Sequence, residues 1–244
     1  MDLSTGLRFR RVLLKLSGEV LAGEQHLGLD REAILSYARQ VAELAKAGFE
    51  VGVVLGGGNF WRGRMAPYMD QVNADSMGML ATIMNGIAFA DALRTQDDQA
   101  AVLMTSISLP QFAELFVASR AIEHLEDGKV VIFAGGTGNP FFTTDSAAAL
   151  RGLQIRADVV LKGTMTDGVY DSDPRKNPQA KRFSSITFTE ALKRDLKVMD
   201  ATAFSLCRDH NLPVYVFNVT VPGNLRKVVI EGENLGTLVK EEMQ

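Results

Sequence analysis

The chain has 244 residues, 46% of them hydrophobic and 23% charged, with a formal net charge of -3 and a pI near 5.7. This length allows a substantial core, and the slightly acidic balance argues against a protein whose main task is to hold nucleic acid, since that needs a strongly basic face. A single cysteine, Cys207, excludes an internal disulfide and any multi-cysteine metal site.

Membrane attachment is not expected from the sequence. Among the basic residues near the N-terminus the apolar run is only Val12, Leu13 and Leu14, which is too short for the core of a signal peptide. No later stretch reaches the roughly 18 uninterrupted apolar residues of a membrane span. We therefore expect a cytoplasmic protein with no membrane and no nucleic acid among its partners.

The first elements predict a β-α-β unit. Residues 11–16 have the apolar, β-branched character of a strand that breaks at Ser17 and Gly18. Asp30 is a good cap for a helix that Gly48 ends, and residues 51–55 form the next strand. Such a unit requires a parallel pair of strands and a right-handed crossover.

The middle of the chain continues the alternation of helices and strands. A long helix is predicted over residues 72–95, with one apolar face formed by Met77, Leu80, Met84, Ile87 and Ala88. Residues 100–104 predict a strand, 111–125 a helix that is either continuous or interrupted, and 130–133 a further strand.

The last hundred residues keep the same pattern. Thr143 or Thr144 caps a helix that runs to about Ile155, and residues 158–161 form a fifth strand. The remaining elements are helices near 189–195, 201–210 and 225–230 and strands at 214–217 and 236–239. We predict an α/β fold in one domain, 1–244: a three-layer sandwich whose central sheet is mostly parallel and carries helices on both faces. The strand order is not derivable from the pattern.

Two strands run into glycine-rich loops. The strand at 51–55 is followed by Gly56, Gly57 and Gly58 with Arg62 and Arg64 beside them, and the strand at 130–133 is followed by residues 134–138. Exposed backbone N–H groups and nearby guanidinium groups favour anions, so the first loop predicts a phosphate site, although a tight turn with a solvated arginine is the plain alternative. In a parallel sheet both loops can line one crevice at the carboxyl ends of the strands.

Three charged residues lie near the same predicted edge of the sheet. Lys15 and Lys162 each stand at the end of an apolar strand, and Asp145 falls in the first turn of a helix that follows a glycine loop. Taken singly, a solvated lysine or a carboxylate favourable to the helix dipole explains each position equally well. Together they fit phosphoryl transfer, in which the protein positions two substrates and stabilises negative charge.

Several other cofactor signatures are missing from the sequence. There is no Gly-x-x-x-x-Gly-Lys-Ser/Thr motif, no convincing Gly-x-Gly-x-x-Gly after the first strand and no Gly-x-Ser-x-Gly elbow. The acidic, turn-rich segment at 167–174 lacks the closing glutamate of an EF-hand loop. A loop that holds a nucleotide ribose or a hydrated metal is the better interpretation of that segment.

Five motifs occur together in the order and approximate spacing found in one enzyme family. They are Lys15-Leu16-Ser17-Gly18-Glu19, Gly56-Gly57-Gly58-Asn59 with Arg62-Gly63, Ala74-Asp75-Ser76-Met77-Gly78-Met79-Leu80-Ala81-Thr82, Thr137-Gly138-Asn139-Pro140-Phe141-Phe142-Thr143-Thr144-Asp145, and Leu196-Lys197-Val198-Met199-Asp200. Over nearly its whole length the chain resembles the bacterial uridylate kinases of the amino acid kinase superfamily. The third and fourth motifs are the ones specific to uridylate kinases.

This resemblance implies reversible transfer of a phosphoryl group from MgATP to UMP, which gives UDP and ADP for pyrimidine nucleotide biosynthesis. It implies Mg²⁺ bound with ATP, a UMP-binding lobe mainly in the N-terminal half and an ATP-binding lobe mainly at about 155–244. Family members are similar in being homohexamers that GTP commonly activates and UTP inhibits.

The resemblance also implies roles for individual residues, none of which is a direct metal ligand. The catalytic residues would be Lys15, Arg62, Asp145 and Lys162. ATP would contact Lys15, Leu16, Ser17, Gly18, Gly58, Arg62, Thr164, Tyr170 and Asp173. UMP would contact Gly57, Asp75, Thr137, Gly138, Asn139, Pro140, Phe141, Phe142, Thr143 and Thr144. The GTP-responsive loop would be Gly23, Glu24, Gln25, His26, Leu27 and Gly28.

The competing hypothesis is a nucleotide-binding regulator or storage protein that kept the fold and lost the chemistry. The presence of Lys15, Arg62 and Asp145 argues against it.

Overall fold

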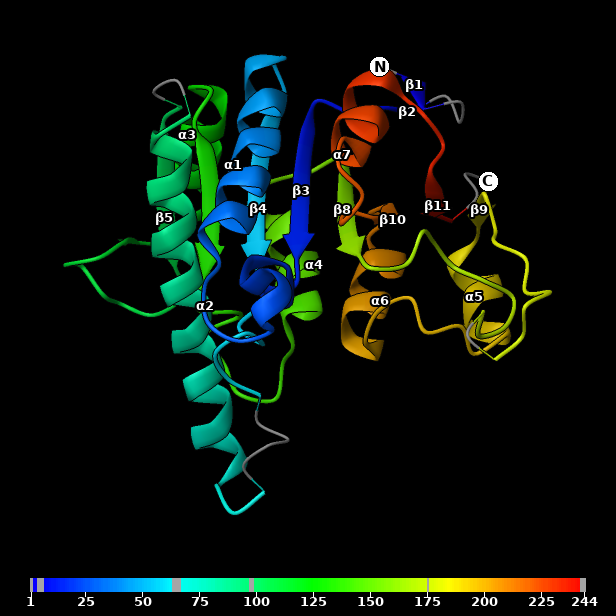
Figure 1. Ribbon diagram of the computed structural model, residues 1–244, viewed down its shortest axis with the longest axis horizontal. Helices are drawn as coiled ribbons and strands as arrows, with labels where there is room; N and C mark the ends of the chain where they lie inside the picture. Colours follow the sequence, from blue (N-terminus) through cyan, green and yellow to red (C-terminus); the bar gives the residue numbers. More distant parts are fainter. Residues whose placement is uncertain (1, 4–6, 63–66, 97–98, 175, 242–244) are drawn as a thin grey trace.

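A single nine-stranded sheet runs through the molecule (Figure 1). The structure, a computed structural model, describes residues 2–3, 7–62, 67–96, 99–174 and 176–241. The strand order is β6-β5-β7-β4-β3-β8-β10-β11-β9, and all neighbours in it are parallel except the pair β10 and β11. The prediction of a mostly parallel α/β sheet is confirmed.

The strands and helices alternate for most of the chain. The strands are β1 (Asp2–Leu3), β2 (Leu7–Arg8), β3 (Arg11–Leu16), β4 (Glu50–Leu55), β5 (Ala101–Thr105), β6 (Glu114–Leu115), β7 (Val130–Ala134), β8 (Val159–Thr164), β9 (Ser185–Ile186), β10 (Val214–Asn218) and β11 (Gly236–Val239). The helices are η1 (Gly18–Gln25), α1 (Arg31–Lys46), α2 (Gln71–Arg94), α3 (Ala118–Glu126), α4 (Thr144–Gln154), α5 (Phe188–Lys193), α6 (Ala201–Asp209), α7 (Asn224–Arg226) and the π-helical turn η3 (Lys227–Glu231).

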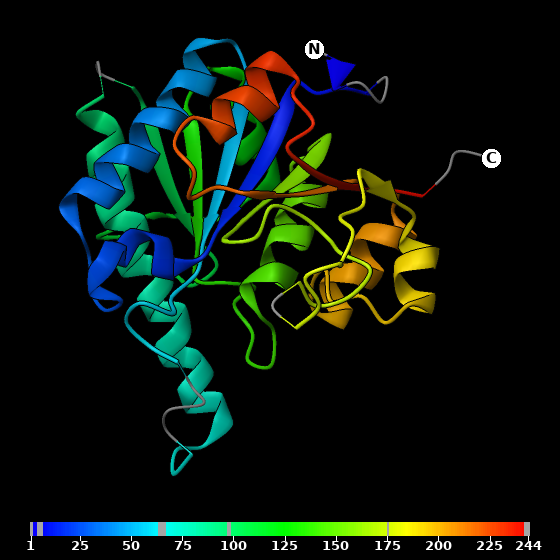
Figure 2. The same cartoon turned by 45° about the vertical axis from the view of Figure 1, so that its right-hand side comes forward.

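Each face of the sheet carries its own hydrophobic core, which makes the fold a three-layer sandwich. Along β3, Val12 and Leu14 pack with α1, α2 and α7, whereas Leu13 packs on the opposite face with α3, α4 and α6. This division follows from the alternation of side chains along a strand. Figures 1 and 2 show α1 and α2 together on one side of the strands, with all the parallel strands ending at the same edge.

The helix α2 extends beyond that edge, so that its N-terminal half stands below the strand ends in Figure 1. Asp70 caps it by accepting hydrogen bonds from the backbone N–H groups of Val72 and Asn73. The face that it turns to the sheet consists largely of small residues, which lets the helix pack closely: a Cβ atom added at Gly86 would lie 2.7 Å from Leu103.

The predicted apolar face of α2 does not pack against the core. Met77, Leu80, Met84 and Ile87 are all exposed, and the buried residues are mainly the smaller ones between them. Hydrophobicity alone did not identify the buried face of the helix, which combines small residues with Ile83, Phe89 and Leu93. The helix is also long and apolar enough to cross a membrane by composition, and half of its most apolar window is buried inside the protein.

The helix predicted over 111–125, continuous or interrupted, occupies only the second part of that range. Residues 114–115 instead form β6, which pairs in parallel with the end of β5, and the helix α3 begins only at Ala118. Phe116 continues this pairing, since its backbone N–H donates to the Thr105 carbonyl at 2.9 Å. Pairing with an open sheet edge therefore overrides the helical pattern of the first seven residues.

Candidate active site

Two lysines and one aspartate form a compact charged cluster at the strand ends. Lys15 on β3 and Lys162 on β8 are partners in the parallel register, so their side chains start at the same level. Asp145 joins them: its Oδ1 lies 2.9 Å from Lys15 Nζ and its Oδ2 lies 2.6 Å from Lys162 Nζ. The Lys15 contact is an ion pair outside hydrogen-bonding geometry, whereas the Lys162 contact is also a hydrogen bond.

The helix α4 fixes Asp145 in this cluster. Thr143 caps the helix, because its hydroxyl accepts hydrogen bonds from the N–H groups of Asp145 and Ser146. The Thr143 hydroxyl and the Ser146 hydroxyl both donate to the carboxylate of Asp200, the residue that caps α6. The start of α4 is therefore tied to the start of α6.

Burial and charge act in opposite directions on these groups. Burial by itself would raise the pKa of Asp145, but the ammonium groups of Lys15 and Lys162 hold that pKa below its usual value. Burial, together with the neighbouring Lys15, lowers the pKa of Lys162 despite the opposing effect of Asp145. The cluster thus keeps two cations and one anion in a nearly dry position, where charges interact strongly with a bound anion.

The glycines after β4 serve mainly to let segments pack closely. A Cβ atom at Gly56 would lie 2.9 Å from the backbone nitrogen of Gly18, and one at Gly57 would lie 2.8 Å from the Gly78 carbonyl oxygen on α2. At Gly58 the nearest atom would be 3.8 Å away. The approach of a ligand can therefore explain why a glycine is present only at Gly58. Gly56 and Gly57 are glycines because η1 and α2 pack closely against them.

A buried pair of asparagines holds this glycine loop. Asn59 and Asn85 are fully buried and exchange two side-chain hydrogen bonds, of 2.7 and 2.9 Å. Asn85 also donates to the Gly56 carbonyl at 2.6 Å, and Asn59 donates to the Gly28 carbonyl at 2.7 Å. The pair links the glycine loop, the helix α2 and the 23–28 loop in one satisfied network.

Arg62 lies at the mouth of the site. Its Nε donates to the Gly58 carbonyl at 2.9 Å, and its Nη2 lies 2.7 Å from Glu19 Oε1 on η1. The guanidinium is only partly buried. Gly63 and Arg64 lie outside the described residues.

One cavity, of about 330 Å³, opens between the glycine loop, α2 and the loop that follows β7. It includes Gly57, Gly58, Asp75, Thr137, Asn139, Phe142, Thr143 and Thr144, all from the predicted UMP or ATP sets. Gly138 instead packs on Ser106, and Pro140 and Phe141 are not part of the lining.

Asp75 connects α2 to this loop. Its Oδ2 accepts a hydrogen bond of 2.7 Å from the backbone N–H of Phe141, a residue with a positive φ of 70°, and its Oδ1 accepts one of 2.8 Å from Gln71. The carboxylate therefore lines the cavity with both oxygens already engaged.

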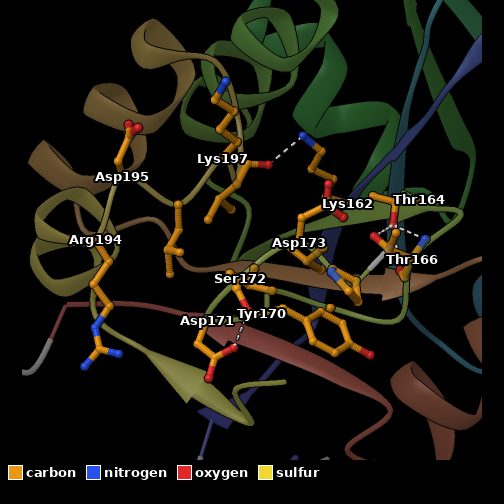
Figure 3. A pocket seen from close by; sticks show the side chains of 16 residues that line it. Lys162, Thr164, Thr166, Tyr170, Asp171, Ser172, Asp173, Arg194, Asp195 and Lys197 are labelled. Atoms are coloured by element: carbon orange, nitrogen blue, oxygen red, sulfur yellow. Dashed lines mark hydrogen bonds between the residues drawn. The ribbon is translucent and has the colours of Figure 1, made fainter. Parts of the chain in front are cut away.

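A second cavity, of about 540 Å³, lies on the other side of Lys162, among the loops after β8 and before α6 (Figure 3). Three predicted ATP contacts, Thr164, Tyr170 and Asp173, line it. Figure 3 shows Lys162 beside them, with its ammonium directed to the Val198 carbonyl at 2.7 Å. The Tyr170 hydroxyl donates to Asp167 at 2.7 Å.

The remaining predicted ATP contacts lie on the sheet side of the charged cluster. Leu16 is fully buried, so only its backbone faces this edge. Ser17 caps η1, and Gly18 is packed tightly, since a Cβ atom there would lie 2.4 Å from Asn59 Oδ1. These two residues therefore shape the connection between β3 and η1, which follows Lys15 in the chain.

The sequence reading missed six residues that line the first cavity: Trp61, Ala74, Gly78, Met79, Thr82 and Gly136. A signal for three of them was available, because Ala74, Gly78 and Thr82 recur every four residues and so share one face of a helix. Among the residues that it missed at the second cavity are Thr166, in the loop after β8, and Arg194, Asp195 and Lys197, in the loop between α5 and α6.

No group of three or more His, Cys, Asp or Glu side chains within the described part of the chain is arranged to hold a metal ion. Asp145 is the carboxylate at the centre of the cluster, and two lysines already neutralise it.

Known proteins share this fold. The model of the amino acid kinase family matches residues 10–218. The structure is similar to that of a UMP kinase from Bacillus anthracis, with a TM-score of 0.93 and 36% identity over 96% of this chain and 97% of that one. A UMP kinase from Ureaplasma parvum matches with a TM-score of 0.91 and 39% identity over 96% and 100% of the two chains.

A more distant match is a uridylate kinase from Archaeoglobus fulgidus, with a TM-score of 0.72 and 28% identity over 93% of this chain and 99% of that one. The family match spans most of the chain, and the first two structures agree with it over nearly the whole fold. The chain therefore belongs to the amino acid kinase family.

Proposed function

We propose that this protein is a UMP kinase, which transfers the γ-phosphoryl group of ATP to UMP and forms UDP and ADP. The observation that carries the proposal is the charged cluster of Lys15, Asp145 and Lys162 between two separate cavities. Lys162 lines the larger cavity, and Thr143 and Thr144, next to Asp145, line the smaller one. Phosphoryl transfer needs two bound substrates with fixed cations between them.

The smaller cavity suits the acceptor. It offers Asp75 to the ribose hydroxyls and the loop from Thr137 to Thr144 to the base and the phosphate, in agreement with the resemblance to uridylate kinases. A carboxylate that can accept from both hydroxyls also disfavours acceptors that lack them. Asp75 would exchange its contacts with Gln71 and the Phe141 N–H for these hydroxyls.

The larger cavity suits the nucleoside part of ATP, through Thr164, Tyr170 and Asp173. Its phosphates would reach back along the strand ends to Lys15, Gly18 and Gly58. Lys15 and Lys162 would then stabilise the charge on the transferring group, and Asp145 would hold both ammonium groups in place. Arg62 would leave Glu19 for the phosphate.

Mg²⁺ fits this scheme as a companion of ATP. Magnesium keeps several water ligands and binds through substrate phosphates and one or two carboxylates, so it needs no cage of protein ligands. Asp145 is the carboxylate within reach of such a hydrated ion. The ion would neutralise charge on the phosphate oxygens of ATP.

The test is an assay of ADP release with a panel of acceptors: UMP, CMP, aspartate, glutamate and carbamate. We expect turnover with UMP and little with the others. Turnover with an amino acid but not with UMP would refute the proposal. Tight binding of nucleotides in calorimetry without any turnover would instead indicate a regulator that has lost the chemistry.

We also propose that the protein is a cytoplasmic homohexamer, as its relatives in the family are expected to be. The exposed stripe of Met77, Leu80, Met84 and Ile87 on α2 supports contact with a second copy, because monomeric soluble proteins seldom expose such an apolar row. The variant Leu80→Glu should lower the oligomeric mass in light scattering. An unchanged oligomeric mass would show that this face of α2 is not part of the interface.

Activation by GTP and inhibition by UTP remain part of the same proposal. The 23–28 loop is connected to the glycine loop through Asn59, which offers a route from effector to site. The groove beneath the loop is lined by Glu19, Glu24 and His26, and by no lysine or arginine among the described residues, so it is a poor site for a triphosphate. Turnover of UMP with and without GTP or UTP tests both effects.

A further inference from the structure

A buried arginine without a carboxylate partner lies beneath the loop that lines the acceptor cavity. Arg151 on α4 is only 5% exposed, and its guanidinium makes no ion pair with a carboxylate among the described residues. Burial lowers the pKa of Arg151 to about 10. Burial of a cation without an anion is costly, so mere packing is a poor reason for an arginine at this position.

The contacts of Arg151 require the shape of an arginine. One terminal nitrogen donates to Gln154 Oε1 and the other donates to Ser106 Oγ at 2.8 Å. The guanidinium carbon lies 4.0 Å from the centre of the Phe116 ring, and this ring packs edge-on against Phe133. A planar group with two separate donors and a flat face can make all these contacts at once, and a lysine cannot.

Ser106 transmits the position of Arg151 to the loop. Its hydroxyl accepts from Arg151 and donates to the Gly136 carbonyl at 2.7 Å. A guanidinium can only donate, so the serine must use its lone pair towards Arg151 and direct its proton elsewhere. The arginine thereby sets the direction of the hydrogen bond that holds the loop.

The loop lies directly on Ser106. Gly135, Gly136 and Gly138 all have positive φ angles, of 77°, 59° and 80°. A Cβ atom at Gly138 would lie 3.0 Å from Ser106 Cβ, and one at Gly135 would lie 3.2 Å from the Ser106 backbone nitrogen. Because Gly136 lines the acceptor cavity, a change at Ser106 would alter the cavity wall.

We propose that Arg151 is a positioning residue for the phosphate acceptor, acting through Ser106 on the loop of residues 135–138. The inference rests on the proposed function, in which this loop binds UMP. Arg151 does not itself line either cavity. Its effect should therefore fall on the acceptor, and ATP binding should be spared.

The test compares Arg151→Met, Ser106→Ala and the double variant, with UMP affinity measured by calorimetry and KM for ATP by steady-state kinetics. We expect each single variant to weaken UMP binding about tenfold, the double variant to be no weaker than the weaker single one, and KM for ATP to change less than about twofold. Arg151→Met should keep the thermal stability of the wild type, since an apolar residue replaces a buried unpaired charge.

Gln154→Met is the matched control, because it removes the other hydrogen bond of Arg151 and leaves Ser106 in place. We expect it to leave UMP affinity within about twofold. The inference is overturned if this control weakens UMP as much as Arg151→Met does, or if Ser106→Ala binds UMP normally. Ser106→Ala decides the question should Arg151→Met fail to fold. Failure of the proposed function would be recognised by a different result, because the wild type itself would then not bind or phosphorylate UMP.

Discussion

The two cavities are built in different ways, although both open beside the same charged cluster. The acceptor cavity is held by long-range contacts from the core: the Asn59 and Asn85 pair, the Thr82 hydroxyl, which accepts from the Gly135 N–H, and Ser106 under Gly136. The donor cavity is held mainly by exposed bonds of its loops, such as Thr164 with the Thr166 carbonyl at 2.7 Å, and Val169 anchors them to the buried Thr237 hydroxyl at 2.9 Å.

This difference bears on how selective each side is. A wall fixed by buried hydrogen bonds resists rearrangement, so it can reject an acceptor that leaves its polar groups unpaired. A wall of exposed loops can adjust to different donors at little cost. We therefore expect strict choice of the phosphate acceptor and weaker dependence on any single donor contact.

The cluster shared by both cavities should show the largest effect. Asp145→Ala should lower kcat by about 10² or more, because Lys15 and Lys162 lose the group that holds them at the transferring phosphate. KM values for both substrates should change far less. Steady-state kinetics with each substrate varied in turn measures this, and a normal kcat would show that the cluster does not take part in the reaction.

The same carboxylate should give a distinct pH dependence of stability. The pKa of Asp145 is lowered in the fold, so its stabilising effect is complete above the unfolded value of 3.8 and is lost as pH falls through the folded value. Asp145→Asn should cost about 3–5 kcal/mol at neutral pH, because it leaves two buried ammonium groups without an anion.

That loss should shrink as the pH falls below the unfolded pKa of 3.8, because the wild-type carboxyl is then protonated as well. Urea unfolding of both proteins across this range provides the measurement. A difference between the two proteins that does not change with pH would mean that Asp145 is not ionised in the cluster.

A substitution in the acceptor cavity should affect the binding of UMP and spare that of ATP. Asp75→Ala should raise KM for UMP about tenfold, since the ribose hydroxyls lose their acceptor, and leave KM for ATP nearly unchanged. Asp75→Asn is the matched control for size. The assignment of the two cavities would be reversed if KM rose for ATP and not for UMP.

A change on the donor side should have the smallest effect. Tyr170→Phe removes the hydrogen bond to Asp167 but keeps the ring in the cavity, so KM for ATP should rise by no more than about threefold. The steady-state KM for ATP checks this, with KM for UMP as the internal control. A much larger rise would show that the donor wall is as demanding as the acceptor wall.

The sequence predicted the acceptor side better than the donor side for a physical reason. The stretch from Thr137 to Asp145 is continuous, so a single motif contains five of the residues that line the acceptor cavity and also Asp145 of the charged cluster. Donor-side residues such as Thr166 and Arg194 come from separate loops, and no local pattern relates them. The family resemblance, the sheet and the Thr143 cap are confirmed.

Other features depend on tertiary packing and could not be read from the pattern. The exposure of Leu80 and Met84 follows from the face of α2 that packs on the sheet, which is the face containing Gly86, and β6 forms because β5 offers an open edge. The tight fit of Gly56 and Gly57 depends on η1 and α2, which are distant in the chain. Arg151 lies in none of the sequence motifs, and the role that we propose for it depends on Ser106, 45 positions earlier in the chain.

The most direct test of the central claim is to identify the products that the wild-type protein forms from ATP and UMP. Chromatography of the reaction mixture should show UDP and ADP appearing in equal amounts, with both greatly reduced in Asp145→Ala. Formation of ADP without UDP, or transfer of phosphate to an amino acid in place of UMP, would contradict the assignment of the acceptor cavity to UMP.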